Sequence, residues 1–211
     1  MLPPLYPILD TATLFERGLE LTAAAAVILE GGAKILQFRH KGHFSRDLFM
    51  KAAAIGALCR QADAIWIVDD RVDMAKLLEA GVHLGQDDLP VQDARKLLGE
   101  GPIIGFSTHN REQLETALSE PADYLALGPI FETGSKAKPD PVVGVDRLRR
   151  WRTLTSKPLV AIGGITRYNA IDVLRAGADS VAVIGDLYPD PLTVSSLHGR
   201  IKEWQTRLTS R

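Results

Sequence analysis

The sequence contains very little cysteine, because Cys59 is the single one among its 211 residues. One cysteine excludes an internal disulfide and a zinc site built from several cysteines, and it agrees with a reducing cytoplasm. Net charge is also nearly absent, since 25 Lys and Arg residues stand against 26 Asp and Glu residues. The net charge of −1 provides no global field that would attract nucleic acid or a membrane, but it does not exclude a local basic pocket.

A long hydrophobic run is missing as well. The longest one, residues 21–29, is interrupted by Thr22 and has about half the length that a membrane-spanning helix requires. No basic segment followed by an apolar one opens the chain, so we expect neither a secretion signal nor a membrane anchor. The 45% hydrophobic and 24% charged residues are typical of a globular protein and exclude a disordered chain. We therefore predict a cytoplasmic enzyme with one domain over residues 1–211.

Short β-branched or apolar runs alternate with amphipathic helical patterns along the chain. We expect eight strands, over residues 5–9, 35–39, 65–68, 82–84, 103–106, 124–127, 159–162 and 180–184. Helical patterns lie between them, over residues 47–59, 72–80, 91–98, 113–118, 146–154 and 168–176. Gly81, Gly99 and Gly177 follow three of these helices where a C-cap is expected, and Asp93 and Asn110 are suited to N-caps.

Strict alternation of strands and helices predicts the α/β class. Eight strands favour a closed (β/α)8 barrel, the TIM-barrel fold, because parallel strands in one sheet are joined by right-handed crossovers. The length of 211 residues lies near the lower limit for this fold. The alternative is an open doubly wound sheet, which would carry a glycine-rich turn after its first strand, whereas Asp10 and Thr11 stand there.

The active site of such a barrel forms at the carboxyl ends of the strands, so the residues that follow each strand are the candidates. The second strand ends in Gln37, Arg39 and Lys41, which strand alternation places on one side. They form either a solvated strand end or a clamp for a phosphate or diphosphate, with Arg39 as a bidentate donor and Lys41 as a point charge. Burying unpaired charges in a barrel mouth is costly, which favours the clamp.

Acidic pairs follow the third and fourth strands, at Asp69-Asp70 and Asp87-Asp88. Taken alone, each pair also fits a helix cap or a solvated loop, and the Leu89-Pro90 that follows fits a turn. Taken together and opposite the clamp, they favour Mg²⁺ on a diphosphate, because Mg²⁺ takes one or two carboxylates with substrate oxygens and water.

The fifth and sixth strands lead into polar loops. Ser107 is suited to donate to an anion and Thr108 to cap the next helix, while His109 fits a surface loop better than an acid–base role. Residues 128–144 form the longest loop, whose hydroxyls, glycine and lysine suit a phosphate-binding lid without forming a Walker loop.

The seventh and eighth strands end in Gly163-Gly164 and Gly185-Asp186. These glycines fit ordinary turns, but in barrels this position commonly binds phosphate through backbone N–H groups. Two phosphate sites would then face each other, one cationic with a metal and the other built from backbone. We infer two phosphorylated small-molecule substrates, and no basic stripe or recognised module supports binding to nucleic acid.

Six motifs, in this order, resemble the thiamine phosphate synthase family. They are residues 37–41 (QFRHK), 69–71 (DDR), 83–88 (HLGQDD), 107–109 (STH), 128–131 with 133–136 (GPIF and TGSK) and 161–165 (AIGGI). The resemblance implies a barrel-shaped transferase that joins 4-amino-5-hydroxymethyl-2-methylpyrimidine diphosphate to 4-methyl-5-(2-phosphoethyl)thiazole. It also implies release of pyrophosphate with the help of Mg²⁺, through a pyrimidine methyl cation that the thiazole nitrogen attacks.

The resemblance further assigns the site residues. The catalytic residues would be Arg39, Lys41, Ser107 and Lys136. The pyrimidine diphosphate would contact Gln37, Arg39, Lys41, Asp69, Ser107 and Lys136. The thiazole phosphate would contact Thr133, Gly134, Ser135, Gly164, Ile184 and Gly185. The Mg²⁺ ligands would be Asp70 and Asp88.

Three positions depart from the pattern of that family. Asp69 replaces the usual asparagine, Ser135 a threonine and Gly185 a serine. Asp69 either contacts the metal or weakens diphosphate binding by like-charge repulsion. Two rival functions stay open, a thiazole tautomerase with His109 as acid and base and a non-catalytic protein that binds thiazole phosphate. The sequence also leaves open whether the protein forms a homodimer.

Overall fold

Eight parallel strands close into a barrel in chain order, with β1 hydrogen-bonded to β8. The computed structural model describes residues 2–134 and 140–209. The strands are β1 (Leu5–Asp10), β2 (Ile35–Arg39), β3 (Ile65–Asp69), β4 (Gly81–Leu84), β5 (Ile104–Thr108), β6 (Tyr124–Leu127), β7 (Leu159–Ile162) and β8 (Ser180–Val183). The predicted (β/α)8 TIM barrel is confirmed, and closure between β1 and β8 excludes the open doubly wound sheet.

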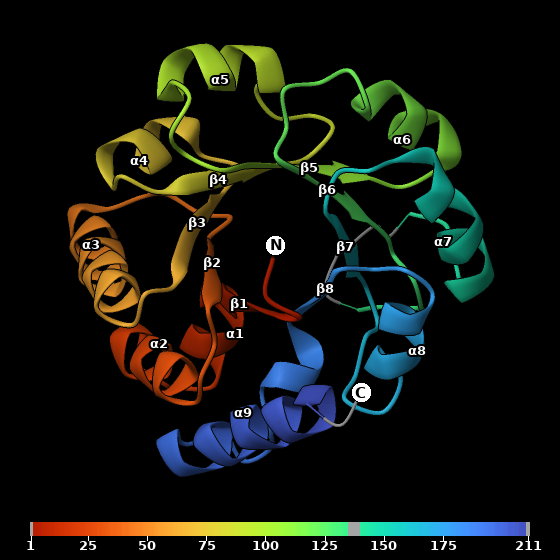
Figure 1. The fold of residues 1–211 in the computed structure, drawn as a ribbon. Coiled ribbons are helices and arrows are strands. Elements are labelled where there is room, and N and C mark those ends of the chain that lie inside the picture. The colour runs from red at the N-terminus through yellow and green to blue at the C-terminus, as the bar shows by residue number, and fades with distance from the viewer. Residues whose placement is uncertain (1, 135–139, 210–211) are drawn as a thin grey trace.

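Helices surround the barrel on its outside, as the view along its axis shows (Figure 1). They are α1 (Thr11–Glu16), α2 (Leu21–Glu30), α3 (Arg46–Gln61), α4 (Val72–Leu77), α5 (Val91–Leu98), α6 (Arg111–Ala117), α7 (Val145–Trp151), α8 (Ala170–Arg175) and α9 (Val194–Thr209). Two short 3₁₀ helices, η1 (Arg152–Leu154) and η2 (Gly185–Leu187), follow α7 and β8. No helix within the described ranges has both the length and the apolar character needed to cross a membrane.

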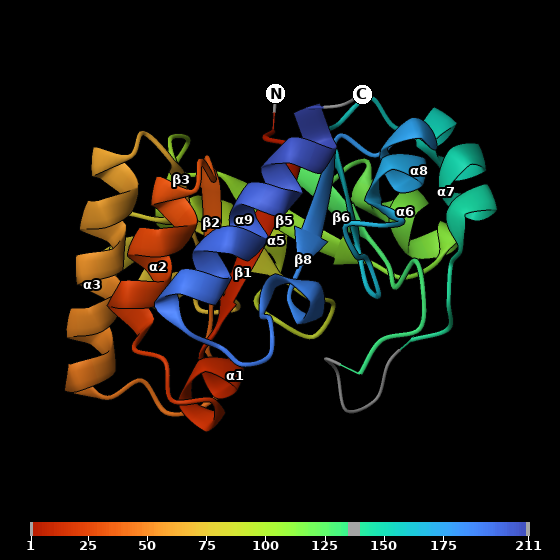
Figure 2. The ribbon, with the colours of Figure 1, turned by 90° about the horizontal axis from the view of Figure 1, so that it is seen from below.

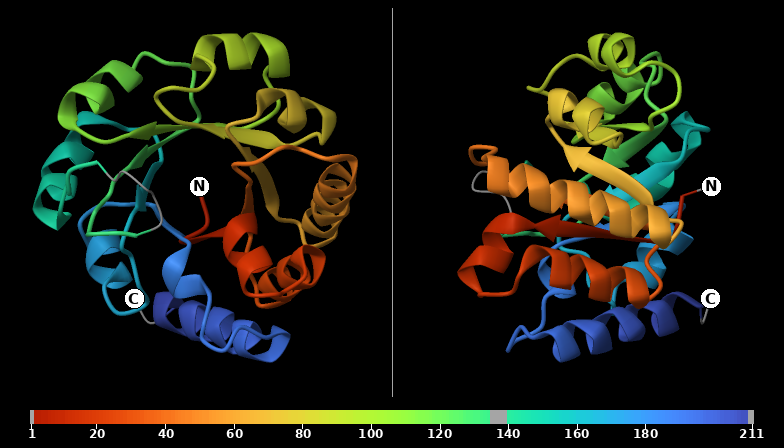
Figure 3. Two further views of the ribbon diagram at one scale, coloured as in Figure 1. Left: turned by 180° about the vertical axis from the view of Figure 1, so that it is seen from behind. Right: turned by 90° about the vertical axis from the view of Figure 1, so that its left-hand side faces the viewer.

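The hydrophobic residues form two layers, one between strands and helices and one inside the barrel. The inner layer consists of Leu2, Tyr6, Ile8, Ile35, Ile67, Tyr124, Ala126, Val160 and Ala182. The start of β1 and the end of α9 lie at one end of the barrel and α1 at the other (Figures 2 and 3). Because α1 directly follows β1, the end that holds α1 is the carboxyl end of the strands.

Three of the predicted caps are confirmed. Asn110 caps α6, where its side chain accepts a hydrogen bond from the Gln113 N–H at 2.9 Å. Gly99 and Gly177 follow α5 and α8 with φ of 80° and 110°, in the left-handed region that favours glycine.

Three other expectations about helix ends are wrong. Asp93 lies inside the first turn of α5, whose N-cap is Pro90. Thr108 is buried and donates to the Ala126 carbonyl at 2.8 Å instead of capping α6. Gly81 is the first residue of β4, because α4 already ends at Leu77.

Gly81 is required by packing between strands. A Cβ at this position would lie 2.6 Å from the Ile103 carbonyl oxygen and 2.7 Å from Ile67 Cδ1. We expect Gly81→Ala to lower the free energy of unfolding by about 1–3 kcal/mol, the usual cost of overpacking. Gly101→Ala is the matched control, since a Cβ there meets no atom within 4 Å. Chemical denaturation followed by circular dichroism measures both variants, and equal stabilities would contradict the packing argument.

Candidate active site

A cavity of about 830 Å³ opens at the carboxyl ends of the strands. The predicted site residues that line it are Gln37, Arg39, Lys41, Asp69, Asp70, Asp88, Ser107, Thr133, Gly134, Gly164, Ile184 and Gly185. Ser135 and Lys136 lie outside the described residues. The fold therefore brings the two predicted phosphate sites to one cavity, while the ligand that each residue binds stays a prediction.

The side chains of β2 alternate as the sequence predicts. Gln37, Arg39 and Lys41 line the cavity. Phe38 points the opposite way, with its ring centroid 5.9 Å from that of Phe44 and 6.0 Å from that of Trp66. The two cations of the predicted clamp thus enter the barrel mouth on the same face of one strand.

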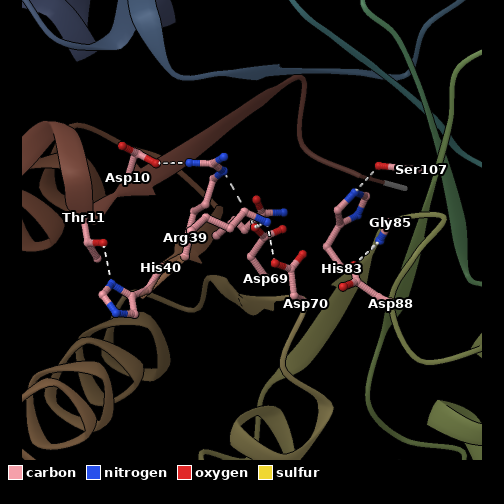
Figure 4. Close-up of polar contacts among 12 residues, drawn as sticks. Asp10, Thr11, Arg39, His40, Asp69, Asp70, His83, Gly85, Asp88 and Ser107 are labelled. Carbon is pink, nitrogen blue, oxygen red and sulfur yellow. Dashed lines mark hydrogen bonds and ion pairs between the residues drawn. The ribbon is translucent and has the colours of Figure 1, made fainter. Parts of the chain in front are cut away.

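Carboxylates from the neighbouring strands hold both clamp cations (Figure 4). Arg39 forms an ion pair with Asp10, and its Nε lies 3.7 Å from Asp69 Oδ2. Lys41 Nζ lies 2.8 Å from Asp69 Oδ2 and also pairs with Asp70. These contacts fix the direction of two long side chains that would otherwise be free to rotate.

Sequence reasoning missed Asp10 as a site residue. Its carboxylate pairs with Arg39 and also caps α1, since it accepts a hydrogen bond from the Thr13 N–H at 3.0 Å. The available signal was its place directly after the first strand, at the same end of the barrel as the other acidic residues.

Asp69 is a buried counterion of the clamp. The pKa of its carboxyl is raised to about 6, mainly by burial and also by the nearby Asp70, against the opposing effects of Lys41 and Arg39. Burial lowers the pKa of the Lys41 ammonium, but Asp69 and Asp70 more than compensate, so that this pKa is raised overall. The extra charge relative to the usual asparagine therefore meets the two cations directly.

Asp70 and Asp88 form a pair of neighbouring carboxylates. Asp70 follows β3 with φ of 61°, and Asp88 Oδ2 accepts a hydrogen bond from the Gly85 N–H at 2.7 Å. Burial is the main cause of a raised pKa at Asp88, to which Asp70 adds by repulsion, while the Gly85 N–H opposes it. An Asp88 carboxylate whose charge is disfavoured by its neighbour fits a cation placed between the two side chains.

The number of acidic ligands fits Mg²⁺ better than a structural metal. Over residues 2–134 and 140–209, no group of three or more His, Cys, Asp and Glu side chains is placed to hold an ion. A structural zinc site needs about four protein ligands, whereas Mg²⁺ accepts one or two carboxylates and completes its shell with substrate oxygens and water.

Glycine turns after β7 and β8 form another part of the cavity wall. Gly163 and Gly164 have φ of 96° and 64°, and a Cβ at Gly164 would lie 2.4 Å from the Glu132 carbonyl oxygen. Gly164 is therefore required both by its backbone conformation and by the loop packed against it. Gly185 begins η2, and a Cβ there would meet no atom within 4 Å. The serine usual at that position would fit, so the exchange to glycine removes a hydroxyl without changing the packing.

Sequence reasoning also missed the polar floor of the cavity. Gln37 Nε2 donates to the Tyr6 hydroxyl at 3.1 Å, and this hydroxyl lies 2.8 Å from that of Tyr124. His83 Nδ1 lies 2.9 Å from the Tyr124 hydroxyl, and His83 Nε2 lies 2.8 Å from Ser107 Oγ. The two tyrosines occur in strands with an apolar pattern, which gave no signal, whereas His83 was part of the motif at residues 83–88.

His109 lies in the wall of the same cavity, with 19% of its side chain exposed. Its Nδ1 lies 2.7 Å from the Gly128 carbonyl oxygen, which can only accept, so this nitrogen carries a proton. The expectation of a surface-loop histidine is therefore wrong in its placement, because the ring faces the cavity.

A closed barrel with cations, acidic residues and glycine turns at its strand ends defines a (β/α)8-barrel enzyme with its active site in this mouth. The thiamine monophosphate synthase family model matches residues 5–187. The chain belongs to this family and is a transferase, as the resemblance predicted.

Individual relatives agree with this assignment. The thiamine-phosphate synthase of Koribacter versatilis is 50% identical over 90% of this chain and 91% of its own length. The thiamine-phosphate synthase of Chlorobium phaeovibrioides is 48% identical over 90% and 92%. The solved structure of thiamine phosphate pyrophosphorylase from Pyrococcus furiosus aligns with a TM-score of 0.84 at 32% identity, covering 98% of this chain and 96% of that chain.

Proposed function

We propose that this enzyme couples 4-amino-5-hydroxymethyl-2-methylpyrimidine diphosphate with 4-methyl-5-(2-phosphoethyl)thiazole to give thiamine phosphate and pyrophosphate, assisted by Mg²⁺. The observation that carries the proposal is the composition of one cavity. Its walls combine the Arg39 and Lys41 clamp, the Asp70 and Asp88 pair and the Gly164 turn. Such a cavity suits two phosphorylated substrates, one of which leaves a diphosphate behind.

The clamp side would bind the leaving group. Arg39 can donate two parallel N–H bonds to diphosphate oxygens, Lys41 adds a point charge and the Ser107 hydroxyl adds a neutral donor. Asp10 and Asp69 keep the two cations aimed into the mouth before the substrate arrives. Mg²⁺ held by Asp70 and Asp88 would act as a Lewis acid that neutralises charge on the departing diphosphate.

The glycine side would bind the thiazole phosphate. Backbone N–H groups around Gly164 and Gly185, with Thr133 and Gly134, would hold the phosphate and aim the ring nitrogen at the pyrimidine methylene carbon. The C–O bond to the diphosphate breaks and a C–N bond to the thiazole forms, so that pyrophosphate carries away the electron pair. This reaction requires no protein nucleophile and no strong base, and the enzyme acts by placement, charge neutralisation and exclusion of water.

Direct assay of the coupling reaction tests the proposal. The purified protein is mixed with both substrates, with Mg²⁺ or with a chelator, and thiamine phosphate is followed by mass spectrometry. We expect product only with Mg²⁺ present. Folded protein that yields no product from both substrates would refute the proposed function.

The tautomerase alternative depends on His109 as an acid–base group. We expect His109→Ala to keep coupling activity within about threefold of the wild type, because acid–base catalysts usually contribute about 100-fold or more. Steady-state kinetics with both substrates measure the effect. A loss of about 100-fold or more would instead support proton transfer by this residue.

Asp69→Asn tests whether the extra carboxylate competes with the diphosphate for the clamp. We expect the variant to bind Mg²⁺-pyrophosphate about 3- to 10-fold more tightly at pH 8, as expected for removal of one nearby like charge. The pKa of about 6 predicts that the gain shrinks toward pH 5, where the wild-type carboxyl is largely protonated. Calorimetric titration of both proteins at each pH measures the difference.

The control for this comparison is Asp73→Asn, since Asp73 is an exposed partner of Arg71. It should leave pyrophosphate binding unchanged at either pH. Weaker binding of Mg²⁺ in Asp69→Asn would contradict the repulsion argument and would make Asp69 a metal ligand.

A further inference from the structure

Five side chains from five strands form one continuous hydrogen-bond chain across the cavity floor. In order they are Gln37 on β2, Tyr6 on β1, Tyr124 on β6, His83 on β4 and Ser107 on β5. The four contacts measure 3.1, 2.8, 2.9 and 2.8 Å. Every one of them is short enough for a direct hydrogen bond.

The direction of this chain is fixed at the Gln37 end. The amide nitrogen of Gln37 can only donate, so the Tyr6 oxygen accepts there. Burial raises the pKa of both Tyr6 and Tyr124, which keeps each as a phenol with one proton. The one arrangement that uses both phenol protons within the chain has Tyr6 donating to Tyr124 and Tyr124 donating to His83 Nδ1.

The direction at Gln37 determines the tautomer at His83. A ring nitrogen that accepts a hydrogen bond carries no proton, so the His83 ring is neutral and carries one proton. Since Nδ1 accepts from Tyr124, that proton resides on Nε2, which donates to Ser107 Oγ at 2.8 Å (Figure 4). With the opposite tautomer Nδ1–H would donate to Tyr124, and one of the two phenol protons would have no acceptor within the chain.

We propose that His83 and Tyr124 are positioning residues that act through Ser107. The Nε2–H group of His83 occupies a lone pair of the Ser107 oxygen and leaves the hydroxyl proton of Ser107 to be donated into the cavity. Because Ser107 has a single proton, the opposite tautomer would draw this proton toward the ring and present only a lone pair to an anion. The floor of the barrel thus keeps Ser107 as a donor before any ligand binds.

Only the identity of the anion in this inference depends on the proposed function. There, the Ser107 proton would be donated to an oxygen of the diphosphate as its charge grows during bond breaking. The tautomer of His83 is a property of the free protein, so it can be measured whether or not the coupling reaction is observed.

Nitrogen-15 NMR of histidine side chains provides the first test. The protein is labelled with ¹⁵N-histidine, and the spectrum of His83→Gln identifies the His83 signals among those of the five histidines. We expect the wild type at neutral pH to show His83 as the Nε2–H tautomer alone. A signal from the Nδ1–H tautomer or from the imidazolium ion would overturn the inference.

Two tyrosine-to-phenylalanine variants distinguish an effect of the hydrogen-bond chain from a general effect of losing a buried hydroxyl. Tyr124→Phe removes the donor to His83 Nδ1, so we expect a mixture of the two tautomers. Tyr188→Phe is the matched control, because the Tyr188 hydroxyl is also buried but bonds to the Ile8 carbonyl and the Asp10 N–H. It should leave His83 entirely as the Nε2–H tautomer. An unchanged tautomer in Tyr124→Phe would show that this residue does not set it.

A double-mutant cycle tests the link to Ser107 in the coupling assay. We expect Tyr124→Phe to lower kcat about tenfold in the wild type but less than about twofold in the Ser107→Ala background, since both act through one hydroxyl. Losses that multiply would refute the coupling between the two residues. A protein with the expected tautomer and no turnover would refute the proposed function alone, and turnover with the wrong tautomer would refute this inference alone.

Discussion

Asp88→Ala is expected to lower kcat for thiamine phosphate formation by about 100- to 1000-fold, equivalent to about 3–4 kcal/mol of transition-state stabilisation. The carboxylate lies beside Asp70 in the cavity wall, and this neighbour contributes to its raised pKa. Under the proposed function, removing Asp88 would leave Mg²⁺ with a single protein ligand while the diphosphate still has to depart. Steady-state kinetics over a range of Mg²⁺ concentrations measure both the rate and the apparent metal affinity.

Two variants serve as controls for Asp88→Ala. Asp87→Ala removes the adjacent exposed carboxylate and should keep kcat within about twofold, in line with a substitution at an exposed position. Asp88→Asn keeps an oxygen that can accept the Gly85 N–H, so the loop retains its hydrogen bond while the charge is lost. We expect Asp88→Asn to be nearly as inactive as Asp88→Ala. Equal losses in Asp87→Ala and Asp88→Ala would contradict the assignment of the metal site.

Arg39→Lys is expected to lower kcat/KM by about 30- to 100-fold although the charge is kept. A guanidinium can donate two parallel bonds to a diphosphate and still face Asp10 and Asp69, whereas an ammonium acts as one point charge. Both kcat and KM for the pyrimidine diphosphate should change, because the contact forms on binding and strengthens as the diphosphate leaves. Kinetics with this substrate varied and the thiazole phosphate saturating measure the two parameters.

Arg71→Lys is the matched control for this exchange. Arg71 pairs with Asp73 on the surface and does not line the cavity, so its kinetics should equal those of the wild type. Wild-type kinetics in Arg39→Lys would refute the bidentate clamp and leave only a requirement for positive charge.

Much of the barrel could be predicted because its strands repeat one simple pattern. The predicted bounds of β2, β6 and β7 agree with the structure residue by residue, since short apolar runs between polar turns leave little choice of register. Helix α2 was passed over because it is apolar on most sides, as it packs on β1 and between α3 and α9. Helix α9 was not predicted either, because it lies beyond the last expected strand. Its sequence did carry a signal, since Leu197, Ile201, Trp204 and Leu208 recur at helical spacing.

Only those site residues that belong to sequence motifs could be predicted. Arg39 and Asp88 stand at strand ends, where the sequence alone indicates charge without a packing role. The partners of these groups depend on contacts between strands. The register of β1 with β2 places Asp10 beside Arg39, and the closed barrel brings the Tyr6 hydroxyl to Tyr124 over 118 positions of sequence. No local pattern records such contacts, and Gly81 was misread for the same reason, because its neighbours Ile67 and Ile103 are distant in the sequence.

The paired state of the clamp has a consequence for selectivity. Around Arg39 and Lys41 the mouth holds the carboxylates of Asp10, Asp69 and Asp70, so the described side chains here carry more negative than positive charge. A bare anion such as inorganic phosphate would have to compete with these carboxylates for the same two cations. A diphosphate that arrives with its own Mg²⁺ brings positive charge for the carboxylates and negative charge for the cations. Under the proposed function, the mouth would therefore favour metal-bound polyphosphates over the simple anions around them.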